Sequence, residues 1–129
     1  MPATLAVVDR DSALEFLFGR INYERTTQIP YRTGGLKLER MQQLLSLVGD
    51  PHLSLPVVHV AGTKGKGSTA TMVARILQTA GYRTGLYTSP HLEKLEERFV
   101  INGQLCSDQE FVQLAADLQA ATYELEARD

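Results

Sequence analysis

The sequence has a single cysteine, no excess of basic residues and no long apolar run. Cys106 is the only cysteine among 129 residues, so the chain cannot form an internal disulfide and has no second thiol for a zinc or redox pair. The formal net charge is −2, and no basic run or arginine-rich patch provides the electrostatic footprint of a nucleic-acid-binding protein. We therefore expect no nucleic-acid partner and a reducing compartment.

Membrane and export signals are missing as well. No segment approaches the roughly 20 apolar residues that a membrane-spanning helix requires. Residues 1–11 lack the charged and apolar blocks of a signal peptide. A hydrophobic content of 43% is enough for one globular domain, or part of one, with its own core. These features predict a soluble cytoplasmic protein that does not bind membranes.

Two helices are predicted in the first part of the chain. Ser12 and Glu15 have the spacing of a capping box and precede a short helix that ends near Gly19. Apolar residues recur at helical spacing over about 36–48, and Gly49 supplies a stop signal. The intervening segment has no hydrophobic period and is expected to be a loop.

The middle of the chain predicts a βαβ unit. Residues 55–61 are rich in β-branched side chains and predict a strand that is buried on both faces. A glycine-rich turn, a helix over 68–80 closed by Gly81, and a second strand over 83–88 follow. Two strands joined by a helix are expected to be parallel, with a right-handed crossover.

A hairpin and a capped helix are predicted after this unit. Residues 99–101 predict a strand that enters a tight turn at the Asn-Gly pair 102–103. Ser107 and Glu110 have capping-box spacing before a helix over about 107–126. Its predicted apolar face consists of Phe111, Leu114, Leu118, Ala121 and Leu125. The fold class is therefore α/β, but two or three strands are too few for a stable doubly wound sheet, so the domain is expected to be truncated.

The strongest chemical signal is a glycine-rich turn between the first predicted strand and its helix. Glycines let backbone N–H groups approach a polyphosphate, and a helix amino terminus adds a partial positive charge. Lys66 would supply a full charge to the β- and γ-phosphates, and Ser68 or Thr69 would cap the helix and offer a hydroxyl to phosphate or magnesium. The residues of this turn are Gly62, Thr63, Lys64, Gly65, Lys66, Gly67, Ser68 and Thr69.

This turn departs from the usual P-loop pattern, because Gly67 stands between Lys66 and Ser68. The alternative is a tight connection that binds nothing. Two lysines at a helix amino terminus argue against that alternative, since like charges beside the positive end of the dipole are unfavourable unless an anion is bound. We therefore interpret the turn as a phosphate site.

A second polar cluster follows the second predicted strand. Ligands in open α/β sheets lie beyond the carboxyl ends of the strands, so Ser89 could reach a magnesium ion or a phosphate there. A turn serine before Pro90 is the alternative. His91 is a candidate substrate contact or a solvated loop histidine. Arg98 could stabilise phosphate charge, or form an ordinary surface pair with Glu97.

Three blocks of the sequence resemble the folylpolyglutamate and dihydrofolate synthases, which share their ATP-binding domain with the Mur ligases. The blocks are His59–Thr69, Ala80–Leu92 and Glu97–Gly103. In this family the shortened glycine loop, with its extra glycine after the lysine, is the rule. Many bacterial members have asparagine at the position of Lys64, and lysine also occurs.

The resemblance implies an ATP-dependent ligase. ATP would phosphorylate a carboxylate of a folate or dihydropteroate, and the amine of L-glutamate would attack the acyl phosphate to form an amide. Lys66 would be catalytic, the glycine loop would bind ATP, and Ser68 and Ser89 would bind Mg²⁺. The positions that would contact the substrate are Thr33, Gly34, Gly35, Leu36, Pro90, His91 and Arg98.

The resemblance also implies a domain arrangement. Residues 1–35 would form an amino-terminal helix and loop, and residues 36–129 the first part of a Mur ligase-like ATP-binding domain with a parallel sheet. The family's other magnesium ligands and its carboxy-terminal domain lie further along the chain, so these residues alone are expected to be inactive and the full-length protein a monomer. A Mur-type amino-acid ligase and a non-catalytic nucleotide-binding module are the alternatives.

Overall fold

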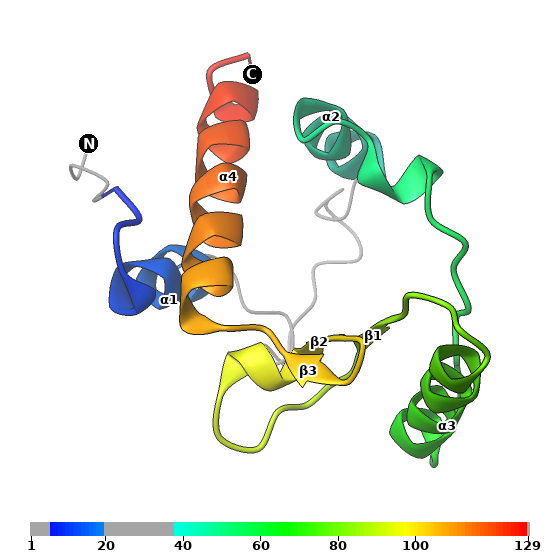
Figure 1. The fold of residues 1–129 in the computed structure, drawn as a ribbon. Coiled ribbons are helices and arrows are strands. Elements are labelled where there is room, and N and C mark those ends of the chain that lie inside the picture. The colour runs from blue at the N-terminus through cyan, green and yellow to red at the C-terminus, as the bar shows by residue number, and fades with distance from the viewer. Residues whose placement is uncertain (1–5, 20–37, 129) are drawn as a thin grey trace. The chain divides into compact units, whose positions relative to one another are not determined.

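The computed structural model describes residues 6–19 and 38–128 (Figure 1). The chain divides into two compact units. One unit consists of residues 1–55 and 112–129, and the other of residues 56–111. Each unit is described by itself below. In the described ranges no helix is both long and apolar enough to cross a membrane.

Helix α1 (Arg10–Phe18) opens the first unit and begins three residues before Ala13, the first helical residue that a cap at Ser12 predicts. Its N-cap is Asp9, whose carboxylate accepts a hydrogen bond from the Ser12 N–H at 2.8 Å. The Ser12 hydroxyl in turn accepts from the Asp9 N–H at 3.1 Å. The predicted capping box of Ser12 and Glu15 is therefore wrong, because Asp9 caps as well as serine does and Ser12 completes the box from the third helical position.

Helix α2 (Leu38–Leu47) lies within the range predicted for the second helix. Gly49 follows it with a φ of +84°, where only glycine is free of strain. The Asp50 N–H donates to Leu45 O at 2.8 Å and the Gly49 N–H donates to Ser46 O at 3.1 Å, which is the Schellman arrangement. The short 3₁₀ helix η1 (Pro51–Leu53) comes next.

Helix α4 (Asp108–Glu126) begins with the predicted capping box. The Ser107 N–H donates to the Glu110 carboxylate at 2.8 Å, and the Glu110 N–H donates to the Ser107 hydroxyl at 3.2 Å. The predicted apolar face of α4 is partly wrong, because Leu114 and Leu118 are 51% and 37% exposed. The buried positions are Phe111, Ala115, Gln119, Ala121 and Leu125.

A polar residue explains this rotated face. The Gln119 side-chain oxygen accepts a hydrogen bond from the Val7 N–H at 3.0 Å, and both residues are buried. A buried backbone N–H needs a hydrogen-bond acceptor, and Gln119 is buried because it supplies one. The buried residues of α4 therefore include the i, i+4 row that passes through Gln119. A pattern built from large apolar residues alone could not include it.

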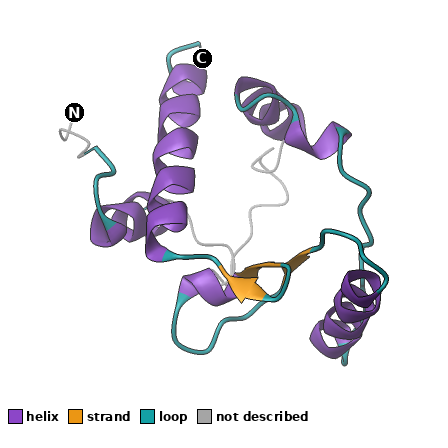
Figure 2. Ribbon diagram, viewed as in Figure 1, coloured by secondary structure: helices purple, strands orange, loops and turns teal. Residues whose placement is uncertain are grey.

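The second unit contains helix α3 and a small sheet (Figure 2). Helix α3 (Lys66–Thr79) ends in the predicted glycine cap, since Gly81 has a φ of +90° and the Tyr82 N–H donates to Leu77 O at 3.0 Å. Strands β1 (Gly85–Tyr87), β2 (Phe99–Ile101) and β3 (Gln104–Leu105) follow, and they pair in the order β1-β2-β3.

The sheet is antiparallel, and the predicted parallel βαβ unit is not present in the part of the chain that the structure describes. Leu86 pairs with Val100, and Val100 pairs with Leu105. The described residues 56–61 form no strand, and Val57 and Val58 are 73% and 66% exposed. A buried parallel strand needs strands beside it and layers on both faces. No described residue pairs with this segment, so its β-branched composition alone does not make it a strand.

The β2–β3 turn has the predicted hairpin geometry. Asn102 and Gly103 have φ values of +50° and +77°, the two positive values of a type I′ turn. The Asn102 N–H donates to Thr84 O, and the Thr84 N–H donates to the Asn102 side-chain oxygen, both at 2.9 Å. The turn is therefore fixed to the start of β1.

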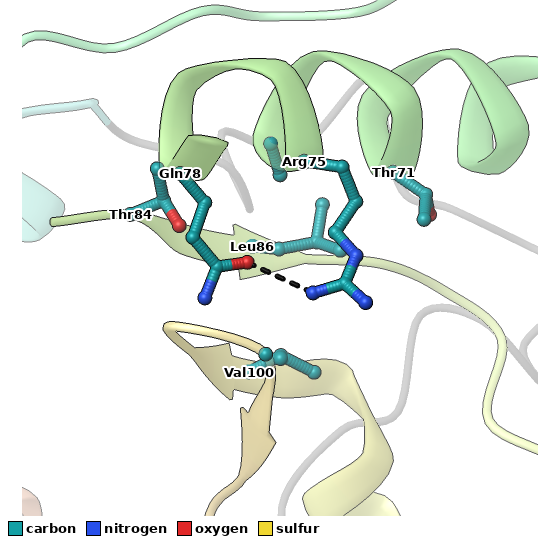
Figure 3. Close-up of a pocket in the computed structure, with 8 residues that line it drawn as sticks. Thr71, Arg75, Gln78, Thr84, Leu86 and Val100 are labelled. Atoms are coloured by element: carbon teal, nitrogen blue, oxygen red, sulfur yellow. Dashed lines mark hydrogen bonds between the residues drawn. The ribbon is translucent and has the colours of Figure 1, made fainter. Parts of the chain in front are cut away.

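A hollow of about 240 Å³ lies between α3 and this hairpin (Figure 3). Arg75 and Gln78 line it from the helix, and a guanidinium nitrogen of Arg75 donates to the Gln78 side-chain oxygen at 3.0 Å. A Cβ atom on Gly103 would lie 3.2 Å from the same guanidinium nitrogen. The turn thus approaches the helix closely at a position where no side chain is present.

We predict that Gly103→Ala weakens the hairpin by about 1 kcal/mol, because alanine is strained at a positive φ and Arg75 would have to move. Hydrogen exchange of the Asn102 and Cys106 amides, which both bond across the sheet, should accelerate about fivefold. The exposed neighbour Gln104→Ala is the control and should leave exchange unchanged. Equal acceleration in both variants would contradict the turn geometry.

Candidate functional site

The glycine-rich turn leads directly into α3. Gly62 and Gly65 have φ values of +153° and +75°, and Gly65 is the N-cap of the helix. Lys66 is therefore the first helical residue and Ser68 the third. The prediction that Ser68 or Thr69 caps the helix is wrong, because the left-handed turn at Gly65 starts the helix earlier and glycine has no side chain with which to cap it.

This uncapped start leaves backbone donors available. The first bond of the helix runs from the Thr69 N–H to Gly65 O at 2.9 Å. The N–H groups of Lys66, Gly67 and Ser68 precede it and have no acceptor within the helix. Residues 61–69 are all exposed. Several donors and the positive end of a helix dipole therefore face solvent together, an arrangement that suits an anion.

Gly67 has no packing reason to be glycine. A Cβ atom at this position would meet no described atom within 4 Å, and its φ is not positive. Its carbonyl accepts a hydrogen bond from the Thr71 hydroxyl at 2.8 Å, which any residue could provide. A glycine in open space at the start of a helix fits close approach by a ligand rather than a demand of the chain itself.

The cations of this turn fit the same ligand. Lys64 precedes the helix and Lys66 is its first residue, so two positive charges stand at the positive end of the α3 dipole. No acidic residue lies in the first turn of the helix to offset them. Such a start is unfavourable on its own and becomes favourable when an anion binds. A di- or triphosphate would supply that negative charge, as well as acceptors for the free N–H groups.

The second cluster lies in a closed loop, residues 88–98, between β1 and β2. The ends of the loop meet where Tyr87 pairs with Phe99 and where the Thr88 N–H donates to Arg98 O at 3.2 Å. The rings of Tyr87 and Phe99 also lie 5.5 Å apart. Ser89 and Pro90 are exposed at the beginning of the loop.

A carboxylate organises the middle of this loop. Glu97, in the 3₁₀ helix η2 (Leu95–Arg98), accepts hydrogen bonds from the N–H groups of Leu92, Glu93 and Lys94 at 2.8, 3.0 and 2.9 Å. These bonds stabilise the charged form and lower the pKa of Glu97 below the ordinary value of 4.5. Glu97 is therefore a structural anion rather than half of a surface ion pair with Arg98.

Arg98 fixes the other side of the loop. It is only 7% exposed, and its Nε donates to Nδ1 of His91 at 2.9 Å. A terminal nitrogen lies 3.5 Å from the Tyr87 hydroxyl, at the limit of a hydrogen bond. The structure thus brings together two of the predicted substrate residues, His91 and Arg98. The sequence did not predict this contact between His91 and Arg98. The only signal for it would have been that the loop containing both residues connects two strands that pair with each other.

Other predicted positions are not brought together by any contact in the described residues. Ser68 lies in the first turn of α3 and Ser89 at the exit of β1, both in the second unit. Thr33, Gly34, Gly35 and Leu36 lie outside the described residues. In the ranges that the structure describes, no three His, Cys, Asp or Glu side chains lie close enough to hold a metal.

Two further features are not part of this site. The hollow beside the hairpin is lined by Arg75 and Gln78, and Arg75 is about 13 Å along α3 from Lys66. Burial raises the pKa of the Cys106 thiol, and Glu110 adds to this shift, so the thiol is a poor nucleophile.

We predict that the 92–94 segment loosens in acid. Because the folded pKa of Glu97 is lowered, its stabilising contribution is fully present above about pH 4.5 and is lost as pH falls through the lower folded value. The amide signals of Leu92, Glu93 and Lys94 should titrate together in an NMR series, with a midpoint below 4.5. Glu97→Gln is the control, and it should abolish this shared titration. A midpoint at or above 4.5 would contradict the bonding pattern.

Comparison with known proteins finds relatives in sequence, although no family model matches. The chain is 41% identical over 114 residues to a folylpolyglutamate synthase of Arabidopsis thaliana, covering 87% of this chain. It is 42% identical over 82 residues to the dihydrofolate synthase/folylpolyglutamate synthase of Bacillus subtilis, covering 64% of this chain. The chain spans only 18% and 19% of the length of these two relatives.

Solved structures agree with these relatives. Folylpolyglutamate synthase from Thermotoga maritima superposes with a TM-score of 0.74 at 34% identity, over 92% of this chain and 25% of that one. A complex of folylpolyglutamate synthase with AMPPCP superposes with a TM-score of 0.79 at 26% identity, over 95% and 27%. The α/β fold class is thereby confirmed. The chain is similar in sequence and in fold to part of the folylpolyglutamate and dihydrofolate synthases, which confirms the family resemblance of its three sequence blocks.

Proposed function

We propose that this chain supplies the phosphate-binding part of an ATP-dependent ligase that joins L-glutamate to a folate. The exposed and uncapped first turn of α3 supports this proposal most strongly. It presents the N–H groups of Lys66, Gly67 and Ser68 and the charge of Lys66 at a helix amino terminus. The ATP analogue in the similar solved complex is in keeping with a nucleotide at this kind of fold.

In the proposed reaction ATP phosphorylates a carboxylate of the folate, and the glutamate amine attacks the resulting acyl phosphate and releases phosphate. Lys66 would neutralise charge on the transferred phosphoryl group, and the loop Gly62–Thr69 would hold the other phosphates. The hydroxyls of Ser68 and Ser89 are the oxygen ligands that this chain offers to Mg²⁺. When bound, Mg²⁺ would offset phosphate charge.

The proposed substrate side consists of the 88–98 loop and residues 33–36. Pro90 and His91 directly follow Ser89, so a carboxylate bound near them would lie beside a metal-held phosphate. Thr33, Gly34, Gly35 and Leu36 would contact the pterin end of the substrate. Dihydropteroate is the second candidate substrate, since the Bacillus subtilis relative is named for both activities.

The remaining proposals concern the whole protein. We propose that residues 36–129 form the first part of the ATP-binding domain and residues 1–35 an amino-terminal helix and loop. We also propose that the enzyme is monomeric and cytoplasmic. The net charge of −2 supports the absence of a nucleic-acid partner. Because the chain spans about a fifth of its relatives, the glutamate site and the other metal ligands would lie in residues outside this sequence.

We predict that Lys66→Ala lowers turnover at least about 100-fold, because the variant loses a preorganised charge at the transferred phosphate. Phosphate release that depends on both ATP and glutamate would be measured with the longest native chain that contains this sequence. Tetrahydrofolate and dihydropteroate would be offered separately. Arg83→Ala, which removes an exposed cation from the same unit, is the control and should retain full activity.

Each outcome of this assay is informative. Turnover with one substrate that Lys66→Ala abolishes would support the ligase and name its branch. ATP binding that depends on Lys66, without turnover on either substrate, would overturn the folate assignment and favour a nucleotide-binding module or a ligase for another carboxylate.

A further inference from the structure

The 88–98 loop contains a buried arginine that donates a hydrogen bond to a histidine. Arg98 is 93% buried, and its Nε donates to Nδ1 of His91 at 2.9 Å. The Arg98 carbonyl accepts from the Thr88 N–H, so the same residue also closes the backbone of the loop. Neither the phosphate contacts nor the proposed metal ligands use this pair.

The chemistry of the two groups fixes the proton on the imidazole. A guanidinium has five N–H donors and no acceptor, so the Nδ1 atom that receives its hydrogen bond must carry a lone pair. The ring proton of His91 is therefore on Nε2. An imidazolium, which has donors on both nitrogens, could not accept this bond. The pair thus selects the neutral ring with an Nε2–H donor.

The same bond makes that donor stronger. A cation that donates to Nδ1 withdraws electron density from the ring and polarises the Nε2–H bond, as in other chains of hydrogen bonds. A polarised donor gains most from an anionic acceptor, because charge-assisted hydrogen bonds are about twice as strong as neutral ones. His91 is half-buried, so a ligand could reach the ring.

The loop holds the ring in place from two directions. The Glu97 carboxylate fixes the backbone at Leu92, the residue after His91, and Arg98 fixes the side chain. Ser89 lies two residues before His91 in the same closed loop. A donor held this firmly is preorganised for a ligand and loses little conformational entropy on binding.

We propose that Arg98 is a positioning residue that holds His91 as the neutral Nε2–H tautomer, and that His91 Nε2–H donates to an oxyanion of the bound substrate. The oxyanion is the carboxylate of the pterin substrate or a phosphate of the nucleotide, which present the same chemistry. This inference rests on the proposed function, since it assigns a contact within that site. Arg98 itself does not touch the ligand in this arrangement.

NMR of the longest native chain, with ¹⁵N-labelled histidine, tests the tautomer directly. The His91 signals, identified by their loss in His91→Gln, should show an unprotonated Nδ1 and a protonated Nε2. Addition of AMPPCP alone and of folate alone forms the two arms, and the oxyanion that binds should shift the Nε2–H signal in its own arm only. A protonated Nδ1, or no shift in either arm while ligase turnover is present, would overturn the proposal.

Kinetics of matched variants distinguish a role of Arg98 in positioning His91 from a role in folding alone. His91→Phe and Arg98→Met should each raise the KM of one substrate about tenfold or more, and the double variant should be no worse than either single one. His91→Gln, which keeps a side-chain N–H near the position of Nε2, should recover most of the loss relative to His91→Phe. Arg83→Met is the control for removal of a cation, and it should match the unchanged protein.

The outcomes distinguish this inference from the proposed function. If Arg98→Met does not fold, the wild-type tautomer and the two ligand arms still decide the question. Absence of turnover in the unchanged protein would count against the proposed function and leave the tautomer measurement valid. Additive losses in the double variant, or equal activity of His91→Gln and His91→Phe, would overturn the donor role of His91.

Discussion

The antiparallel pairing of β1 with β2 is the constraint on which the second unit depends. It joins Gly85–Tyr87 to Phe99–Ile101 and so closes the 88–98 loop between them. The same pairing sets the β2–β3 turn beside Thr84, where Asn102 bonds it in both directions. Without this register Arg98 would not face His91, and Ser89 would lie on an open strand end rather than in a closed loop.

The second unit contains two kinds of polar site, and they differ in whether their charged groups have partners within the chain. At the start of α3, cations and free N–H groups gather in solvent without an anion of their own. In the 88–98 loop two charged side chains are engaged, since Glu97 accepts from three N–H groups and Arg98 donates to His91. An incomplete site beside a completed one is the division expected between a ligand site and the scaffold that holds it.

The sequence predicted those features whose cause lies within a few residues. The Ser107–Glu110 capping box, the Gly81 helix end and the Asn-Gly turn each depend on local backbone geometry, and each is confirmed. The strand over 55–61 and the apolar face of α4 were wrong because they depend on what packs against them. No sequence pattern could include Gln119 in a core, since its burial follows from a bond to Val7, 112 residues away.

The same limit applies to the site. The glycine loop was predictable because glycine, lysine and hydroxyl residues stand together in the chain, although its helix starts at Lys66 rather than Ser68. Arg98 and His91 were both named as candidates, yet their contact was not foreseen. It arises only when two strands separated by the loop pair with each other, and a single sequence does not specify such a pairing.

The first turn of α3 is the proposed binding site for the phosphates of ATP. The most direct measurement is the amide spectrum of the native protein as AMPPCP and Mg²⁺ are added. We predict that the N–H signals of Lys66, Gly67 and Ser68 shift strongly and saturably, because these donors have no acceptor within the helix. Saturable binding of the nucleotide that leaves these three signals unchanged would contradict it.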